Sequence, residues 1–187
     1  MAGRGNFCVD LAMGRVGERV VGDVLKENGF YVLITGDFSG LKDGKVPSLC
    51  GAGKDRLPMP DMLVCKEGNT RWFEAKAKKG PAFYRKAGIW THGVDTHKLD
   101  YYRNIQKTTG IKVDVGVLEI DNFLLVTAPL DVLERNVHSV SARVGETFFP
   151  RDVFEQRYDL TGRYEVEEFA RSSQTVVDTA TGDLSPV

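Results

Sequence analysis

The length and composition of the chain set the first limits. With 187 residues, 42% of them hydrophobic, it can form one domain with a sizeable core. A net charge of −1 gives no overall basic excess for binding phosphates, so the local distribution of charge matters more. There is no apolar run long enough to span a membrane, no signal-peptide pattern, and no regular cysteine spacing. We therefore expect a cytoplasmic protein with free thiols at Cys8, Cys50 and Cys65.

The N-terminal part predicts a helix, a strand and a long loop. Residues 1–13 carry little pattern, so we expect a loose start. The helix is predicted over Gly14 to Asn28 and ends at Gly29, because one apolar arc contains Val20, Val21, Val24 and Leu25. Phe30 to Thr35 is typical of a strand. The basic, glycine-rich segment from Gly36 to Met59 predicts a long loop, which we interpret as a substrate-contacting flap, a dimer arm or a mobile insertion.

The middle of the chain predicts a hairpin followed by a helix. Asp61 to Lys78 reads as two strands joined by a tight turn, with Gly68 or Asn69 at positive φ. We expect residues 80–93 to be irregular. A helix is predicted from Asp95 or Thr96 to Thr109, ended by Gly110, because one face groups Leu99, Tyr102, Ile105 and Gln106.

The rest of the chain predicts a buried strand and smaller elements. Val113 to Glu119 is almost continuously apolar, which favours the centre of a sheet, and Asn122 to Thr127 follows as another strand. Pro129 opens a predicted short helix whose buried side has Leu130, Leu133 and Val137. We expect an extra hairpin or edge element over Glu146 to Leu160 and Tyr164 to Phe169. The tail from Arg171 onward is predicted to be disordered.

Three polar residues in the hairpin carry the strongest functional signal. Side chains alternate along a strand, so Glu74 and Lys76 share one face while Phe73, Ala75 and Ala77 take the other. The hairpin also places Asp61 near Glu74. Two carboxylates and an ammonium that converge at a sheet edge suit a hard cation and the hydrolysis of a phosphodiester.

These residues resemble the signature of the PD-(D/E)XK nuclease superfamily, which includes restriction endonucleases and Holliday junction resolvases. The resemblance covers roughly Gly14 to Leu130, with Glu18 and Gln106 where such nucleases often place auxiliary groups. It implies a restriction-endonuclease-like αβββαβ core, with a mixed central sheet flanked by helices. The pattern of residues alone supports a mixed α/β domain with a central sheet.

The site chemistry follows from these assignments. Asp61, Glu74 and the main-chain carbonyl of Ala75 are expected to hold Mg²⁺, with Mn²⁺ able to substitute. Lys76 would orient or help to deprotonate a water molecule, or neutralise the phosphate. Glu18 would support the metal, and Gln106 would orient the water or a phosphate. Each of these residues also has an alternative, purely structural role. These roles are a turn cap at Asp61, a surface ion pair of Glu74 with Lys76, a solvated Glu18 and a hydrogen-bonded core amide at Gln106.

A basic and aromatic stretch beside the motif predicts contacts with nucleic acid. We expect phosphate or base contacts from Lys78, Lys79, Tyr84, Arg85, Lys86, Trp90, His92 and His97. Alternatives are a solvated charged face, a Trp90 that belongs to the core, and a zinc site using Cys50, Cys65, His92 and His97, whose spacing fits no known finger.

The sequence thus predicts a divalent-metal-dependent endonuclease acting on DNA. A homodimer would suit this activity, because cutting two strands favours a two-fold arrangement of sites. The predicted domain spans residues 1–170, with a nuclease core at about 14–137 and an extension at 138–170. The rival hypotheses are a catalytically silent nucleic-acid-binding module, an accessory protein of DNA replication or recombination, and an enzyme with RNA as its substrate.

Overall fold

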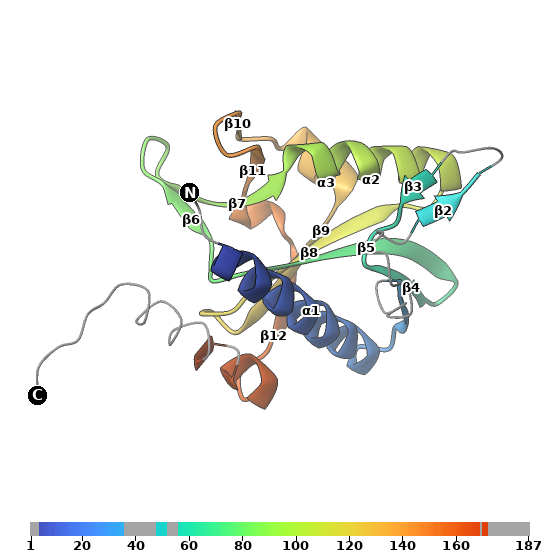
Figure 1. Cartoon of the computed structure of the whole chain (residues 1–187), viewed down its shortest axis with the longest axis horizontal. Coiled ribbons are helices and arrows are strands. Elements are labelled where there is room, and N and C mark those ends of the chain that lie inside the picture. The colour runs from blue at the N-terminus through green and yellow to red at the C-terminus, as the bar shows by residue number, and fades with distance from the viewer. Residues whose placement is uncertain (1–3, 36–47, 52–55, 169, 172–187) are drawn as a thin grey trace, which may run out of the picture.

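A six-stranded mixed sheet forms the centre of the protein in the computed structural model, which describes residues 4–35, 48–51, 56–168 and 170–171 (Figure 1). The strands in spatial order are β1 (Tyr31–Ile34), β4 (Met62–Lys66), β5 (Asn69–Lys78), β8 (Val113–Glu119), β9 (Leu124–Pro129) and β12 (Gln156–Asp159). The helices are α1 (Arg4–Glu27), α2 (Thr96–Thr109) and α3 (Leu130–Arg135). Helix α1 packs on one face of this sheet, and α2 and α3 pack on the other.

The element order confirms the predicted αβββαβ core. Helix α1 is followed by β1, β4 and β5 as antiparallel neighbours, then by α2, and β8 returns parallel to β5. Strand β8 is buried along almost all of its length, as its apolar run predicted. The β4–β5 turn has positive φ at Glu67 and Gly68, which agrees with Gly68 as one of the two predicted positions.

Helix α1 begins earlier than its apolar pattern predicted. It starts at Arg4, so the expectation of a loose start through Met13 is wrong for residues 4–13. The predicted arc faces the core, and the helix ends before Gly29, whose φ is +84°. A side chain at Gly17 would place its Cβ 2.8 Å from that of Ala77, so this glycine allows α1 to approach β5 closely.

A second sheet, which we call the wing, replaces the irregular segment expected over residues 80–93. Its strands in order are β10 (Ser139–Ser141), β11 (Glu146–Pro150), β7 (Ile89–Asp95) and β6 (Ala82–Tyr84). The inner strand β7 pairs with β11, which lies far along the chain. A local sequence pattern cannot predict a strand partner that is so distant in sequence. The wing therefore joins the middle of the chain to its C-terminal third.

The C-terminal third corrects several other expectations. Strand β12 is an edge strand, as predicted, but residues 164–168 are helical rather than part of a hairpin or edge. Strand β9 ends at Pro129, which lies at the N-cap of α3 instead of in its first turn. Val137 is 43% exposed, so only Leu130 and Leu133 of the predicted set are buried.

Several predictions concern residues outside the described part of the chain. The long segment contains a small hairpin of β2 (Ser48–Cys50) and β3 (Arg56–Pro58), while residues 36–47 and 52–55 lie outside the described residues. The predicted tail lies outside them from residue 172 onward, and so does the side chain of Cys8. Cys50 and Cys65 are free thiols, as expected. In the described part of the chain, no helix has the length and apolar character needed to cross a membrane.

Candidate active site

The β4–β5 hairpin brings Asp61 next to Glu74. Met62 pairs with Phe73 in the antiparallel register, so Asp61, just before β4, lies level with Glu74. The main-chain N–H of Ala75 donates a hydrogen bond of 2.8 Å to Asp61 Oδ2. Glu74 is only 1% exposed. The Glu74 carboxylate is therefore buried beside Asp61, which is itself half-buried.

Burial and like charge perturb these carboxyl groups. Burial, and then the charge of Glu74, raise the pKa of Asp61 to about 7. The pKa of Glu18 on α1 is also raised, first by burial and then by Glu74. Glu18 thus lies within electrostatic reach of Glu74 and Lys76. Perturbed carboxyl groups of this kind are frequent at functional sites.

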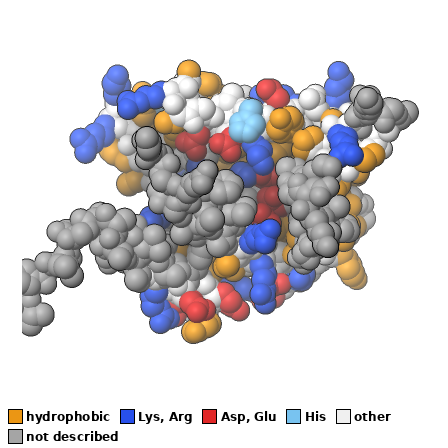
Figure 2. Space-filling model, viewed as in Figure 1, with side chains coloured by type: hydrophobic (Ala, Val, Ile, Leu, Met, Phe, Trp, Pro, Cys, Tyr) orange, Lys and Arg blue, Asp and Glu red, His pale blue; other side chains and the backbone are white. Residues whose placement is uncertain are grey.

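Lys76 is the principal cation of the site. Its ammonium forms an ion pair and a hydrogen bond with Glu74 Oε1. Burial alone would lower the pKa of Lys76, but the charges of Glu74 and Asp61 outweigh burial and raise it. Lys76 is therefore charged at neutral pH. Figure 2 shows acidic side chains next to Lys and Arg side chains near the middle of one face of the molecule.

Helix α2 adds two groups that the sequence interpretation did not assign to the site. Lys98 Nζ lies 3.8 Å from Glu74 Oε1. The hydroxyl of Tyr102 is buried near Glu74, and burial followed by the charge of Glu74 raises its pKa. The sequence held one signal for them: Lys98 and Tyr102 are four residues apart, which places both on the same face of the first turns of α2.

The donor set fits a divalent cation. Asp61 and Glu74 offer the hard oxygen ligands that Mg²⁺ and Mn²⁺ take. A cation between them would offset the burial and the repulsion by Glu74 that together raise the pKa of Asp61. No group of three or more His, Cys, Asp or Glu side chains able to hold a metal is found in the described part of the chain. A cation would thus depend on two carboxylates, the Ala75 carbonyl and water.

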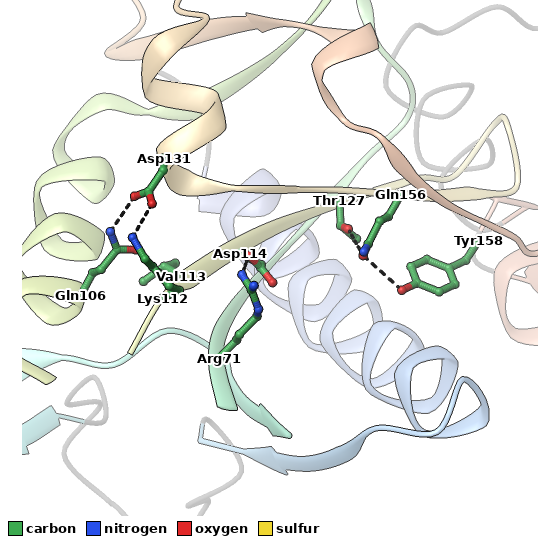
Figure 3. Close-up of polar contacts among 9 residues, drawn as sticks. All are labelled: Arg71, Gln106, Lys112, Val113, Asp114, Thr127, Asp131, Gln156 and Tyr158. Atoms are coloured by element: carbon green, nitrogen blue, oxygen red, sulfur yellow. Dashed lines mark hydrogen bonds and ion pairs between the residues drawn. The ribbon is translucent and has the colours of Figure 1, made fainter. Parts of the chain in front are cut away.

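Gln106 lies among structural hydrogen bonds rather than in contact with these carboxylates. Its Nε2 donates to Asp131 Oδ1 at 2.7 Å, and its Oε1 accepts from the main-chain N–H of Val113 at 3.0 Å (Figure 3). Lys112 holds the same Asp131 carboxylate. Both ends of the amide are occupied, which fits the alternative interpretation of a satisfied amide.

The predicted nucleic-acid contacts fall into exposed and buried groups. The exposed residues are Lys79, Tyr84, Arg85, Lys86, Trp90 and His97. Lys78 is half-buried and pairs with Glu146 at 2.9 Å. His92 is only 1% exposed, and its Nε2 lies 2.8 Å from Glu119 Oε1. The prediction of a direct phosphate contact by His92 is therefore wrong, because its ring is enclosed between Glu119 and Phe154.

The alternative of a zinc site receives no support from the described residues. His92 is committed to Glu119, Cys50 is exposed, and His97 packs edge-on against Tyr101. The same residues contain no cluster of three metal-binding side chains that would include these groups.

Comparisons with known proteins add structural neighbours. No protein-family model matches the sequence, and no curated protein matches it. Among solved structures, the chain is similar to Hjc, a Holliday junction resolvase from the archaeal hyperthermophile Archaeoglobus fulgidus, with 13% identity, a TM-score of 0.49, and coverage of 75% of this chain and 91% of that one. It is also similar to a nuclease from a fusselovirus, with 13% identity, a TM-score of 0.37, and coverage of 90% and 97%.

Proposed function

We propose that the protein hydrolyses DNA phosphodiester bonds with the help of a divalent cation and selects its substrate by structure. The observation that carries this proposal is the convergence of the Asp61 and Glu74 carboxylates with the Lys76 ammonium. This arrangement combines oxygen donors for a hard cation with a positive charge for the phosphate. The αβββαβ core that presents these residues agrees with the predicted resemblance.

The carboxylates and the Ala75 carbonyl would hold Mg²⁺ or Mn²⁺. When bound, the cation would supply Lewis acidity at the phosphate and lower the pKa of a water molecule. The Ala75 N–H fixes the Oδ2 atom of Asp61, and no hydrogen bond to Oδ1 is found among the described residues. Glu74 Oε1 is engaged by Lys76, so a cation must compete with that ammonium or use the second oxygen of Glu74.

The cations of the site stabilise negative charge. Because the pKa of Lys76 is raised, this side chain is poorly suited to accept a proton and well suited to neutralise the oxygens of the phosphate in the transition state. Lys98 brings a second positive charge from α2. Glu18, whose pKa is raised, would support the cation or the attacking water from α1. No role in the reaction is proposed for Gln106.

The exposed basic residues would contact the DNA backbone. The exposed cations are Lys79, just after β5, and Arg85 and Lys86, in the turn between β6 and β7 of the wing. The overall charge of the chain is nearly balanced. Local cations of this kind position a phosphate backbone without reading its sequence. A homodimer would let two such sites cut two strands, and light scattering of the purified protein would measure its mass.

A cleavage assay tests the proposal. Supercoiled plasmid, single strands and a synthetic four-way junction are incubated with the protein in Mn²⁺ or in EDTA, beside Glu74→Ala and the surface control Glu165→Ala. We expect cleavage that needs both the metal and Glu74, while Glu165→Ala matches wild type. Absence of cleavage on every substrate by folded protein would contradict the proposal, and metal-independent DNA binding would then favour a silent binding module.

A further inference from the structure

A cavity of about 640 Å³ lies between the wing, helix α3 and the segment leading into β12. Trp90 of β7, Asn136 after α3, and Arg151 and Arg157 line it. Arg151 begins η1 (Arg151–Val153), a single helical turn. The volume falls within the range of pockets that bind small organic groups, about 300–1,000 Å³, and is ample for one nucleotide.

An exposed aromatic pair marks this cavity. Trp90 is 52% exposed and Phe83 is 48% exposed, although both are large apolar side chains. Their ring centroids lie 4.9 Å apart, so Phe83 supports the indole from the neighbouring strand. An indole held in this way offers a flat surface to a planar ligand, and nucleobases stack on such surfaces whatever their identity.

The charges around the cavity suit a strand of nucleic acid. The lining itself is balanced, with Arg151 and Arg157 against Asp152 and Glu155, and the adjacent turn between β6 and β7 adds the cations Arg85 and Lys86. Arg151 is fixed by two hydrogen bonds of 2.7 Å to Glu119, while Arg85, Lys86 and Arg157 are exposed. Phosphates would meet the exposed cations, and an uncharged base would enter the mixed interior.

We propose that this cavity binds an unpaired nucleobase of the DNA substrate, stacked on Trp90, while Arg85, Lys86 and Arg157 contact the phosphates of the same strand. This inference rests on the proposed nuclease function and specifies its substrate class. The preferred DNA would contain a separated strand, as a branch or a junction of single and double strands does.

The geometry of β7 explains why a separated strand is favoured. Trp90 and Asp95 lie on opposite faces of this strand, because side chains alternate, and the charge of Asp95 acts on Lys76. Trp90 and Asp95 are five positions apart along the strand, which at about 3.3 Å per residue places their Cα atoms about 17 Å apart. A continuous duplex would lie against one face of the wing, whereas a separated strand can pass around its edge strand β6.

Binding measured in EDTA tests this subsite without cleavage. Labelled single strands, blunt duplex and a fork are titrated against wild type, Trp90→Ala, Trp90→Phe and the control Tyr31→Ala, which removes an exposed aromatic from β1. We expect Trp90→Ala to weaken binding of single strands and forks about 5- to 100-fold, as the loss of one base stack does, with duplex binding unchanged. Trp90→Phe should recover part of the affinity, and Tyr31→Ala should match wild type.

The outcomes separate this proposal from the proposed function. If wild type cleaves DNA and Trp90→Ala binds and cleaves every substrate equally well, the base subsite is refuted and the nuclease proposal stands. If wild type cleaves nothing but strand binding depends on Trp90, the nuclease proposal fails and the subsite stands. Free dTMP that quenches Trp90 fluorescence as tightly as a strand would overturn the assignment to DNA. Circular dichroism checks that each variant is folded.

Discussion

The main-chain N–H of Ala75 holds the carboxylate of Asp61 at 2.8 Å, so the residue that opens one strand is fixed to the residue that follows Glu74 on the next. The backbone of β5 therefore positions both carboxylates of the candidate site. A small change in the register of this hairpin would separate them, because a slip of one residue turns every side chain to the other face.

Asp61 should make the stability of the metal-free protein depend on pH. In the unfolded chain this carboxyl ionises near the ordinary aspartate pKa of 3.8, whereas in the folded protein its pKa is about 7 because it is buried beside Glu74. The folded state thus loses stability as pH rises from about 4 to 7. We expect Asp61→Asn, which does not titrate, to gain stability relative to wild type over this range.

Urea unfolding in EDTA at pH 5 and pH 8 would measure the difference. Asp23→Asn, which changes a carboxylate half-exposed on α1, serves as the control. A constant difference between wild type and Asp61→Asn at both pH values would contradict the raised pKa.

Lys98 should contribute to turnover rather than to folding. Removing a partly exposed cation 3.8 Å from Glu74 reduces the positive charge available to the phosphate. We expect Lys98→Met to lower kcat about 10-fold or more with an unchanged unfolding midpoint, and Lys98→Arg to restore part of it. The control is Lys107→Met in the last turn of α2. Equal cleavage rates for Lys98→Met and Lys107→Met would show that Lys98 does not contribute to the reaction.

Gln106 should contribute to stability rather than to catalysis. Gln106→Leu leaves the buried N–H of Val113 without its acceptor and removes a donor from Asp131, which costs about 1–3 kcal/mol of unfolding free energy. Cleavage per folded molecule should stay within about twofold of wild type. A large loss of activity in a variant of normal stability would instead support the role first predicted from the sequence.

Glu119 should be a major structural carboxylate. Burial alone would raise its pKa, but hydrogen bonds from His92, Arg151 and Asn122 outweigh burial and lower the pKa to about 2. Breaking a buried ion pair costs about 3–5 kcal/mol, so Glu119→Gln should strongly destabilise the protein at pH 7. The stabilisation exists above pH 4.5 and is lost as pH falls toward 2, so the difference should shrink in acid.

Denaturant unfolding against pH checks this expectation. The matched control is Asp114→Asn, which removes a carboxylate paired with the more exposed Arg71 at 3.0 Å and should cost under about 1 kcal/mol. Similar losses of unfolding free energy in Glu119→Gln and Asp114→Asn would show that the hydrogen bonds of Glu119 stabilise the protein no more than an exposed ion pair does.

The core of the site was predictable because it depends on local rules. A strand period of two was enough to place Glu74 and Lys76 together, and a hairpin with a tight turn was enough to bring Asp61 level with them. Glu18 was assigned from the resemblance, and α1 does bring it within electrostatic reach of Glu74. Asp61, Glu74 and Lys76 needed only the periodicity of their own elements and the order in which the elements occur.

The remainder depends on contacts between distant elements. Whether His92 meets solvent or Glu119 is decided by β8 and by Arg151, and neither lies near it in sequence. Lys98 reaches Glu74 only because α2 crosses the sheet where it does. The strand at residues 89–95 could not be recognised because its side chains lack a clear alternation and its partner is β11.

The pairing of β7 with β11 also has a consequence for the integrity of the protein. A fragment that ended at residue 137 would retain the carboxylate site but expose the hydrogen-bonding edge of β7 and leave Glu119 without Arg151. Unpaired strand edges are templates for intermolecular pairing, so such a fragment should aggregate. Proteolytic trimming or recombinant design that treats the residues after α3 as dispensable would thus remove part of the folding unit.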